Sequence, residues 1–133
     1  MKLTAAQKRK MTALGRKAGL LLLYVYGSRA RGDFYAGSDL DLAYQSSRRL
    51  SLREEYGLRS ELTQIFADEN IDLVDISAAP PLLLYFIATE GSRLYGNPAA
   101  DDSFYRRALM RFIDAKPLIE ATKQYVKNYI EHI

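Results

Sequence analysis

The sequence predicts an α+β fold, a small mixed α/β sheet with flanking helices. Three observations carry this prediction: a continuous apolar run of strand length at 20–26, a polar and apolar alternation at 38–44, and apolar residues at helical spacing elsewhere. The segments follow the order helix, strand, strand, helix, strand, helix, helix, which favours one sheet covered by helices. A length of 133 residues suits a single domain.

The first part of the chain is predicted to form a helix and two strands. A capping-box pattern begins at Thr4 and Gly19 stands where a helix would end, so residues 5–18 are expected to be helical. The run at 20–26 has the character of a strand buried on both faces. The alternation at 38–44 predicts a second strand with one polar face.

The remainder is predicted to continue as alternating helices and strands. Its segments are a helix from the capping box at Ser51 to about residue 68, a strand over 70–77, a helix from Pro81 to Gly91, and a short edge strand over 93–95. Apolar residues then recur every three or four positions, which predicts a long C-terminal helix at about 101–131. Pro117 falls inside this stripe, so a kink or a break is expected there.

Composition and charge exclude several classes of protein. The chain has no cysteine, which excludes disulfide bonds, thiolate metal sites and cysteine nucleophiles and makes a cytoplasmic location the default expectation. The run at 20–26 is too short to span a membrane, and no export signal is recognised. A net charge of +3 weakly favours anionic partners such as nucleotides or RNA. Basic residues concentrated in the first helix are interpreted as a solvated face, with an RNA contact as the alternative.

Acidic residues on two successive predicted strands indicate a site for a hard divalent cation. Asp39 and Asp41 lie on the same face of the second strand. Asp72 and Asp75, on the third strand, are the candidates for a third ligand. Because they are an odd number of residues apart, they point to opposite faces, and the periodicity alone does not choose between them. Mg²⁺ is the expected ion because it prefers oxygen ligands and is commonly shared with substrate phosphates.

A nucleotide-binding turn is predicted between the first two strands. Gly27 would allow close approach of the backbone to a phosphate, and Ser28 could hold a phosphate oxygen or cap a short helix. Arg29 and Arg31 add positive charge whose geometry suits phosphate. Ser38, beside the acidic pair, completes the predicted nucleotide-binding residues.

The spacing of these residues resembles a known family. Gly27-Ser28, ten intervening residues and Asp39-Leu40-Asp41 match the GSx10DxD motif of the DNA polymerase β-like nucleotidyltransferase superfamily. The resemblance implies the polymerase β-like nucleotidyltransferase fold. In that family the third carboxylate lies at the position of Asp72. Asp39, Asp41 and Asp72 are therefore the expected catalytic residues and the ligands of two Mg²⁺ ions, with Asp72 as the candidate general base.

A narrower resemblance extends over most of the chain. GSRARG, SDLDL, IDLVDIS and APPLLLYFIATEGSRLYG, followed by a helical segment, are similar to the minimal nucleotidyltransferase antitoxins of HEPN/MNT toxin–antitoxin pairs. This resemblance implies that residues 1–133 form a single minimal nucleotidyltransferase domain. It also implies transfer of AMP from ATP to a tyrosine of a cognate HEPN-family RNase toxin, which forms a hetero-oligomer with the antitoxin and is neutralised.

Alternative interpretations stay open at this point. The chain could neutralise its toxin by binding alone, with a vestigial nucleotide site, or it could modify a small molecule or an RNA end. Tyr125 and Tyr129 could belong to a partner surface or to the core. Asp33 is assigned to the turn, and no catalytic or metal role is expected for His132.

Overall fold

A single mixed sheet forms the centre of the computed structural model, which describes residues 1–32 and 38–133. In these ranges the strands are β1 (Leu20–Tyr26), β2 (Leu40–Ser46), β3 (Ile71–Asp75) and β4 (Ser92–Tyr95). Their order across the sheet is β3-β2-β1-β4. β1 is antiparallel to both β2 and β4, whereas β2 and β3 are parallel. The predicted α+β class with a small mixed sheet is confirmed.

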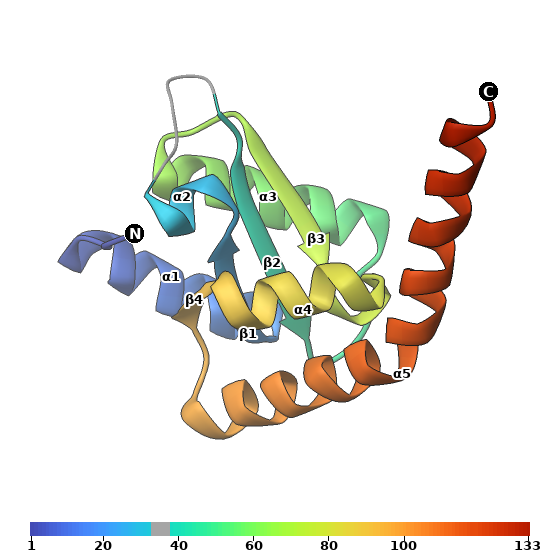
Figure 1. Ribbon diagram of the computed structural model, residues 1–133. Helices are drawn as coiled ribbons and strands as arrows, with labels where there is room; N and C mark the ends of the chain where they lie inside the picture. The colour runs from blue at the N-terminus through green and yellow to red at the C-terminus, as the bar shows by residue number, and fades with distance from the viewer. Residues whose placement is uncertain (33–37) are drawn as a thin grey trace.

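Helices cover both faces of the sheet (Figure 1). One face packs against α1 (Ala5–Ala18) and α3 (Leu52–Phe66), and the other against α4 (Pro81–Glu90) and the first part of α5 (Pro98–Glu131). The short α2 (Ser28–Arg31) follows β1 directly. A 3-10 turn, η1 (Ile76–Ala78), connects β3 to α4.

The alternating side chains of β1 divide the core between the two faces. Leu23 and Val25 pack with the α1 and α3 side, whereas Leu22, Tyr24 and Tyr26 pack with the α4 and α5 side. β1 lies inside the sheet between two partner strands and is buried on both faces, except for Leu21. The continuous apolar run in the sequence is thus explained by its central position.

Most predicted boundaries are confirmed by local contacts. Capping boxes at Thr4 and Ser51 begin α1 and α3, and Gly19 ends α1 in the left-handed region with φ 68°. β3 is shorter than predicted because the Asp75 carboxylate accepts hydrogen bonds from the Ser77 N–H and hydroxyl at 2.9 and 2.6 Å. These bonds turn the chain into η1 and end the strand.

Two other boundaries differ from the expected ones. β2 begins at Leu40, the first residue paired with β3, and continues to Ser46, which pairs with the start of β1. α5 begins at Pro98, before the expected position, because the Asn97 side chain accepts a hydrogen bond from the Ala100 N–H at 2.8 Å.

The long C-terminal helix bends along its length (Figure 1). Pro117 lies inside it, and a proline in a helix interior removes one hydrogen bond and crowds the preceding turn. The expected kink is confirmed, and the helix continues beyond it. The first part buries Phe104 and Ala108, whereas residues 120–133 are all exposed. Tyr125 and Tyr129 are 73% and 62% exposed, so their interpretation as core residues is wrong.

The basic residues of the N-terminal segment are exposed on the outer side of α1, as expected for a solvated face. In the described ranges, no helix combines the length and apolar character that crossing a bilayer requires.

Candidate functional site

Two carboxylates meet where β2 and β3 run in parallel. Asp41 and Asp72 are direct register partners, so their side chains leave the same face of the sheet beside one another. Asp41 is half-buried and Asp72 is exposed, so the pair is open to solvent on one side. Further along β2 and β3, Ala43 and Val74 lie on this same face, where α4 packs against the sheet.

Asp75 lies outside this pair. It is the register partner of Tyr44, whose side chain packs into the core on the opposite face of the sheet. The Asp75 carboxylate is held by Ser77 in the cap described above. The structure therefore places Asp72 beside Asp41 and Asp75 away from it.

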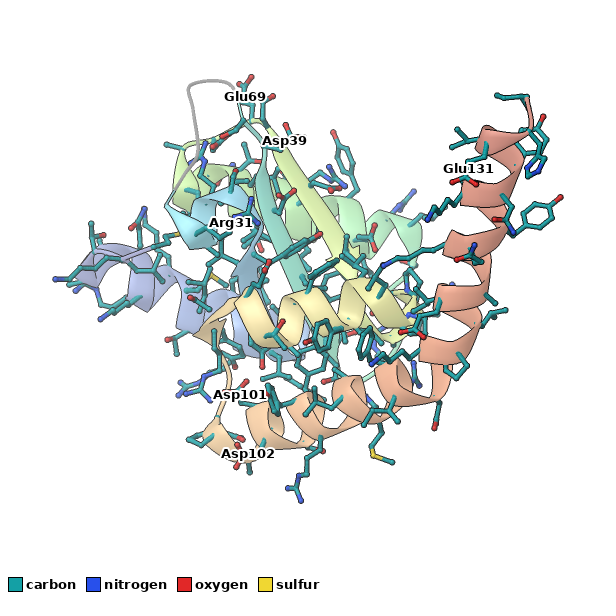
Figure 2. The ribbon with its side chains drawn as sticks, in the orientation of Figure 1. Arg31, Asp39, Glu69, Asp101, Asp102 and Glu131 are labelled. Carbon is teal, nitrogen blue, oxygen red and sulfur yellow. The ribbon has the colours of Figure 1, made fainter. Side chains whose placement is uncertain are left out.

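Asp39 lies just before β2, at the same end of the sheet. Its side chain is exposed, and Figure 2 shows it at the upper end of the sheet, on the same side as Arg31 and Glu69. It lies two positions before Asp41, and its charge acts on the Asp41 carboxyl group. The three predicted acidic residues are thus gathered at one end of the sheet, with Asp41 and Asp72 in direct register.

The electrostatics of this end show that the acidic groups influence one another. Burial raises the pKa of Asp41, and the negative charges of Asp72 and Asp39 raise it further, while Arg31 acts in the opposite direction. Burial, followed by the charges of Asp41 and Asp72, raises the pKa of Tyr26 to about 12. Negative charge concentrated in this way favours binding of a cation.

Gly27 directly follows β1 and lies against the Asp41 carboxylate. A Cβ atom at this position would lie 2.4 Å from Asp41 Oδ2, and the backbone has φ 73°. The conformation favours glycine, and a side chain at this position would displace the Asp41 carboxylate. Gly27 is also the N-cap residue of α2, and Ser28 is the first residue inside the helix. The interpretation of Ser28 as the cap is therefore wrong, and Ser28 is a half-buried residue that directly follows the glycine.

Arg31 lies at the end of α2, close enough to lower the pKa of Asp41. Its Nη1 is 3.6 Å from Glu90 Oε2 at the end of α4, and both side chains are about half exposed. This exposed position places a guanidinium next to the carboxylates, where an anionic substrate would be neutralised.

Arg29 and Ser38 are in contact with each other. Arg29 Nη2 donates to the Ser38 carbonyl at 3.3 Å and to Asp68 Oδ2 at 2.9 Å. Ser38 is buried, and within residues 1–32 and 38–133 its Oγ has no hydrogen-bond partner. A buried hydroxyl without a partner is costly and therefore suits a ligand-binding position. The predicted turn residue Asp33 lies outside the described residues.

The carboxylates of Asp41 and Asp72 fit a hard cation as a pair. No group of three or more histidine, cysteine or acidic side chains that could hold a metal is present in the described ranges. Asp41 and Asp72 offer neighbouring carboxylate oxygens, the ligands that Mg²⁺ prefers. A cation between them would offset both the burial of the Asp41 carboxylate and the repulsion from Asp72, the two largest causes of its raised pKa. Water and substrate phosphates normally supply the other ligands of Mg²⁺.

Two residues near the site were not predicted from the sequence. Tyr26 is the register partner of Asp41 on β1, and Asp68 is the ion-pair partner of Arg29. The even spacing of Leu22, Tyr24 and Tyr26 signals a shared face for Tyr26, but its neighbours on β2 depend on the register. Asp68 lies 39 residues from Arg29, and no local pattern indicates their contact.

Comparison with known proteins defines the class of this site. The family model described as polymerase beta, nucleotidyltransferase matches residues 11–99, which include the sheet, α2 and the three acidic residues. The chain belongs to this nucleotidyltransferase family. The resemblance in the GSx10DxD motif and the polymerase β-like fold are confirmed.

Individual relatives are more specific. The protein adenylyltransferase MntA of Aphanizomenon flos-aquae is 28% identical over 123 residues, which cover 84% of this chain and 81% of the relative. A crystal structure of a toxin–antitoxin with AMP-PNP matches with a TM-score of 0.71 and 25% identity, over 93% of this chain and 98% of that chain. The complex of a tri-AMPylated Shewanella oneidensis HEPN toxin with its MNT antitoxin shows the same fold, with a TM-score of 0.67 and 23% identity over 95% and 97% of the chains.

Proposed function

We propose that this chain is a protein adenylyltransferase that transfers AMP from ATP to a tyrosine of a cognate HEPN-family RNase toxin and so acts as its antitoxin. The observation that carries the proposal is the pairing of Asp41 with Asp72 beside the Gly27 turn. The adenylyltransferase relative and the toxin–antitoxin structure with AMP-PNP support the choice of nucleotide and partner. Residues 1–133 would form one minimal nucleotidyltransferase domain that assembles with the toxin.

The turn after β1 would bind the triphosphate of ATP. Gly27 leaves room for a phosphate to approach the backbone, and the Ser28 hydroxyl and the Arg31 guanidinium would donate to phosphate oxygens. Ser38 would offer its buried hydroxyl to the nucleotide. Arg29, also predicted as a phosphate contact, has partners in the protein that suggest a second role, described below.

Asp39, Asp41 and Asp72 would hold Mg²⁺, and the resemblance implies two ions. When bound, the metal would supply positive charge that stabilises the phosphate groups during transfer. The chain's own contribution is to place carboxylate oxygens from two strands at one end of the sheet, beside the turn that would bind phosphate. ATP as substrate and the absence of cysteine fit a cytoplasmic location.

The exposed position of Asp72 suits a role toward the acceptor. A tyrosine hydroxyl has an ordinary pKa of about 10, so a base is needed near neutral pH. The phenolic oxygen would form a bond to the α-phosphorus, and the bond from that phosphorus to the pyrophosphate oxygen would break. Asp72 would accept the phenolic proton, and pyrophosphate would leave. An acceptor protein can reach this carboxylate because it lies on the open side of the pair.

Intact-mass spectrometry of the toxin tests the proposal. The toxin, ATP and Mg²⁺ are incubated with the wild-type chain or with the Asp39→Ala, Asp41→Ala variant. Addition of AMP units by the wild type alone is the expected result. Asp102→Asn is the matched control, because Asp102 is an exposed carboxylate at the opposite end of the molecule (Figure 2) and should leave transfer unchanged.

Two other functions give different results in the same assay. If the toxin mass is unchanged but the toxin is still neutralised, the chain acts by occlusion, for which the exposed apolar side chains of α5 offer a surface. If AMP is instead found on a small molecule or an RNA end, the chemistry holds and the acceptor is wrong.

A further inference from the structure

An ion pair connects the turn that would bind nucleotide to the strands that carry the carboxylates. Arg29 Nη2 on α2 lies 2.9 Å from Asp68 Oδ2, just after α3. The two side chains are only 21% and 18% exposed. A hydrogen bond between charged groups is stronger than a neutral one, and burial protects this pair from the screening that weakens surface pairs.

The same guanidinium fixes the backbone before Asp39. Arg29 Nη2 donates to the Ser38 carbonyl at 3.3 Å, and Ser38 immediately precedes Asp39. On the other side of Asp39, the Leu40 N–H donates to the Asn70 carbonyl at 2.8 Å. The backbone that carries Asp39 is therefore held at both neighbouring residues.

Asp68 extends these contacts to the strand that carries Asp72. Its Oδ1 accepts a hydrogen bond from the Asn70 N–H at 2.9 Å, which orders the turn before β3. Asn70 is the residue that accepts from Leu40, and the next residue, Ile71, begins the pairing of β3 with Leu40. One carboxylate thus holds Arg29 with one oxygen and the start of the β2–β3 pairing with the other.

We propose that Arg29 and Asp68 are positioning residues that hold Asp39, Asp41 and Asp72 in their relative placement, a role that rests on the proposed nucleotidyl transfer. The Arg29–Asp68 pair acts through the backbone and the strand register. This positioning role differs from the phosphate contact that the sequence predicts for Arg29. An arginine that only contacts phosphate would not need an ion pair with Asp68.

A double-mutant cycle separates the two roles. Arg29→Ala, Asp68→Ala and the double variant are compared for kcat and for the KM of ATP in AMP transfer to the toxin. Positioning predicts that each single variant lowers kcat by about 10- to 100-fold with little change in KM, and that the double variant is no worse than the more impaired single variant. An increase in KM for Arg29→Ala alone, with losses that multiply in the double variant, would overturn the proposal.

Matched variants control for stability. Asp68→Asn retains an oxygen that can accept from the Asn70 N–H but loses the charge, so it isolates the ion pair if Asp68→Ala folds poorly. It should reproduce the loss of kcat, and an unchanged kcat would contradict the proposal. Lys17→Ala breaks an exposed ion pair with Glu61 between α1 and α3 and should change neither parameter.

Amide hydrogen exchange gives a readout that does not depend on the reaction. Exchange at the Leu40 N–H should accelerate in Arg29→Ala and Asp68→Ala. This N–H donates to the Asn70 carbonyl, and both variants remove contacts that hold the turn containing Asn70. Unchanged exchange would contradict the positioning role whatever the activity. A wild-type chain that transfers no AMP would contradict the proposed function instead, and accelerated exchange would then still show that the ion pair holds this turn.

Discussion

The carboxylate end of the sheet and the second part of α5 differ in how their side chains are held. At the carboxylate end, Asp41 lies against Gly27, and the neighbouring turns are tied by an ion pair and backbone hydrogen bonds. In the second part of α5, apolar side chains extend into solvent. Polar side chains at the proposed site are thus held by specific contacts with their neighbours. The apolar side chains of the second part of α5 contribute little to the core.

The two parts of α5 give the largest expected contrast in stability. Phe104 is buried and its ring centroid lies 5.2 Å from that of Tyr24. Phe104→Ala should lower the free energy of unfolding by about 3–5 kcal/mol, because it removes a large buried side chain. Tyr129→Ala should change it by less than about 0.5 kcal/mol, because Tyr129 is exposed. Chemical denaturation measures both, and similar losses for the two variants would mean that the whole helix belongs to the core.

The close contact at Gly27 gives a smaller effect on stability and a large one on the site. Gly27→Ala should lower stability by about 1–2 kcal/mol, because φ is positive and the new Cβ meets the Asp41 carboxylate. Displacement of Asp41 should also lower the rate of AMP transfer by about 100-fold.

Gly57→Ala is the matched control for that glycine. It lies within α3, and an added Cβ there would meet no atom of the described residues within 4 Å, apart from its chain neighbours and the backbone of its own helix. We expect this variant to gain roughly 0.5–1 kcal/mol and to retain activity. Equal activity in the two variants would show that the contact with Asp41 has no bearing on the reaction.

The smallest expected effect concerns the charge of Asp41. Its pKa is raised in the folded protein, so the ionised group opposes folding at neutral pH, and that penalty disappears as the pH falls through the pKa of the folded state. Asp41→Asn should raise the Tm by roughly 1–2 °C at pH 7, since solvent screens a half-exposed group. The gain should vanish at low pH. A Tm gain that is independent of pH would contradict the view that the penalty comes from burying the Asp41 charge near Asp72 and Asp39.

Local patterns in the sequence predict much of this molecule. The capping residues Thr4 and Ser51, the apolar run of β1 and the kink at Pro117 depend on neighbours within a few positions, and the structure confirms them. Strand ends depend on specific side-chain contacts, as the cap formed by Asp75 shows, and their prediction was less accurate.

The arrangement of the site depends on contacts between distant residues. Strand periodicity places Asp39 and Asp41 on one face, but only the pairing of β2 with β3 shows that Asp72, and not Asp75, lies beside Asp41. The partnership of Arg29 with Asp68 likewise requires the packed fold. The family resemblance selects Asp72 independently of this pairing, because the third carboxylate of the family lies at the matching position of this strand.

The most direct test of the proposed site compares Asp72→Asn with Asp75→Asn. Both variants remove one carboxylate charge from β3, but Asp72 is paired with Asp41 and Asp75 is held by Ser77. The rate of AMP transfer to the toxin is measured for each folded variant. We predict a loss on the order of 1,000-fold for Asp72→Asn, because a metal ligand and base are removed, and a loss of less than about 10-fold for Asp75→Asn. Equal losses, or a larger loss for Asp75→Asn, would contradict the assignment of the Asp41–Asp72 pair as the centre of nucleotidyl transfer.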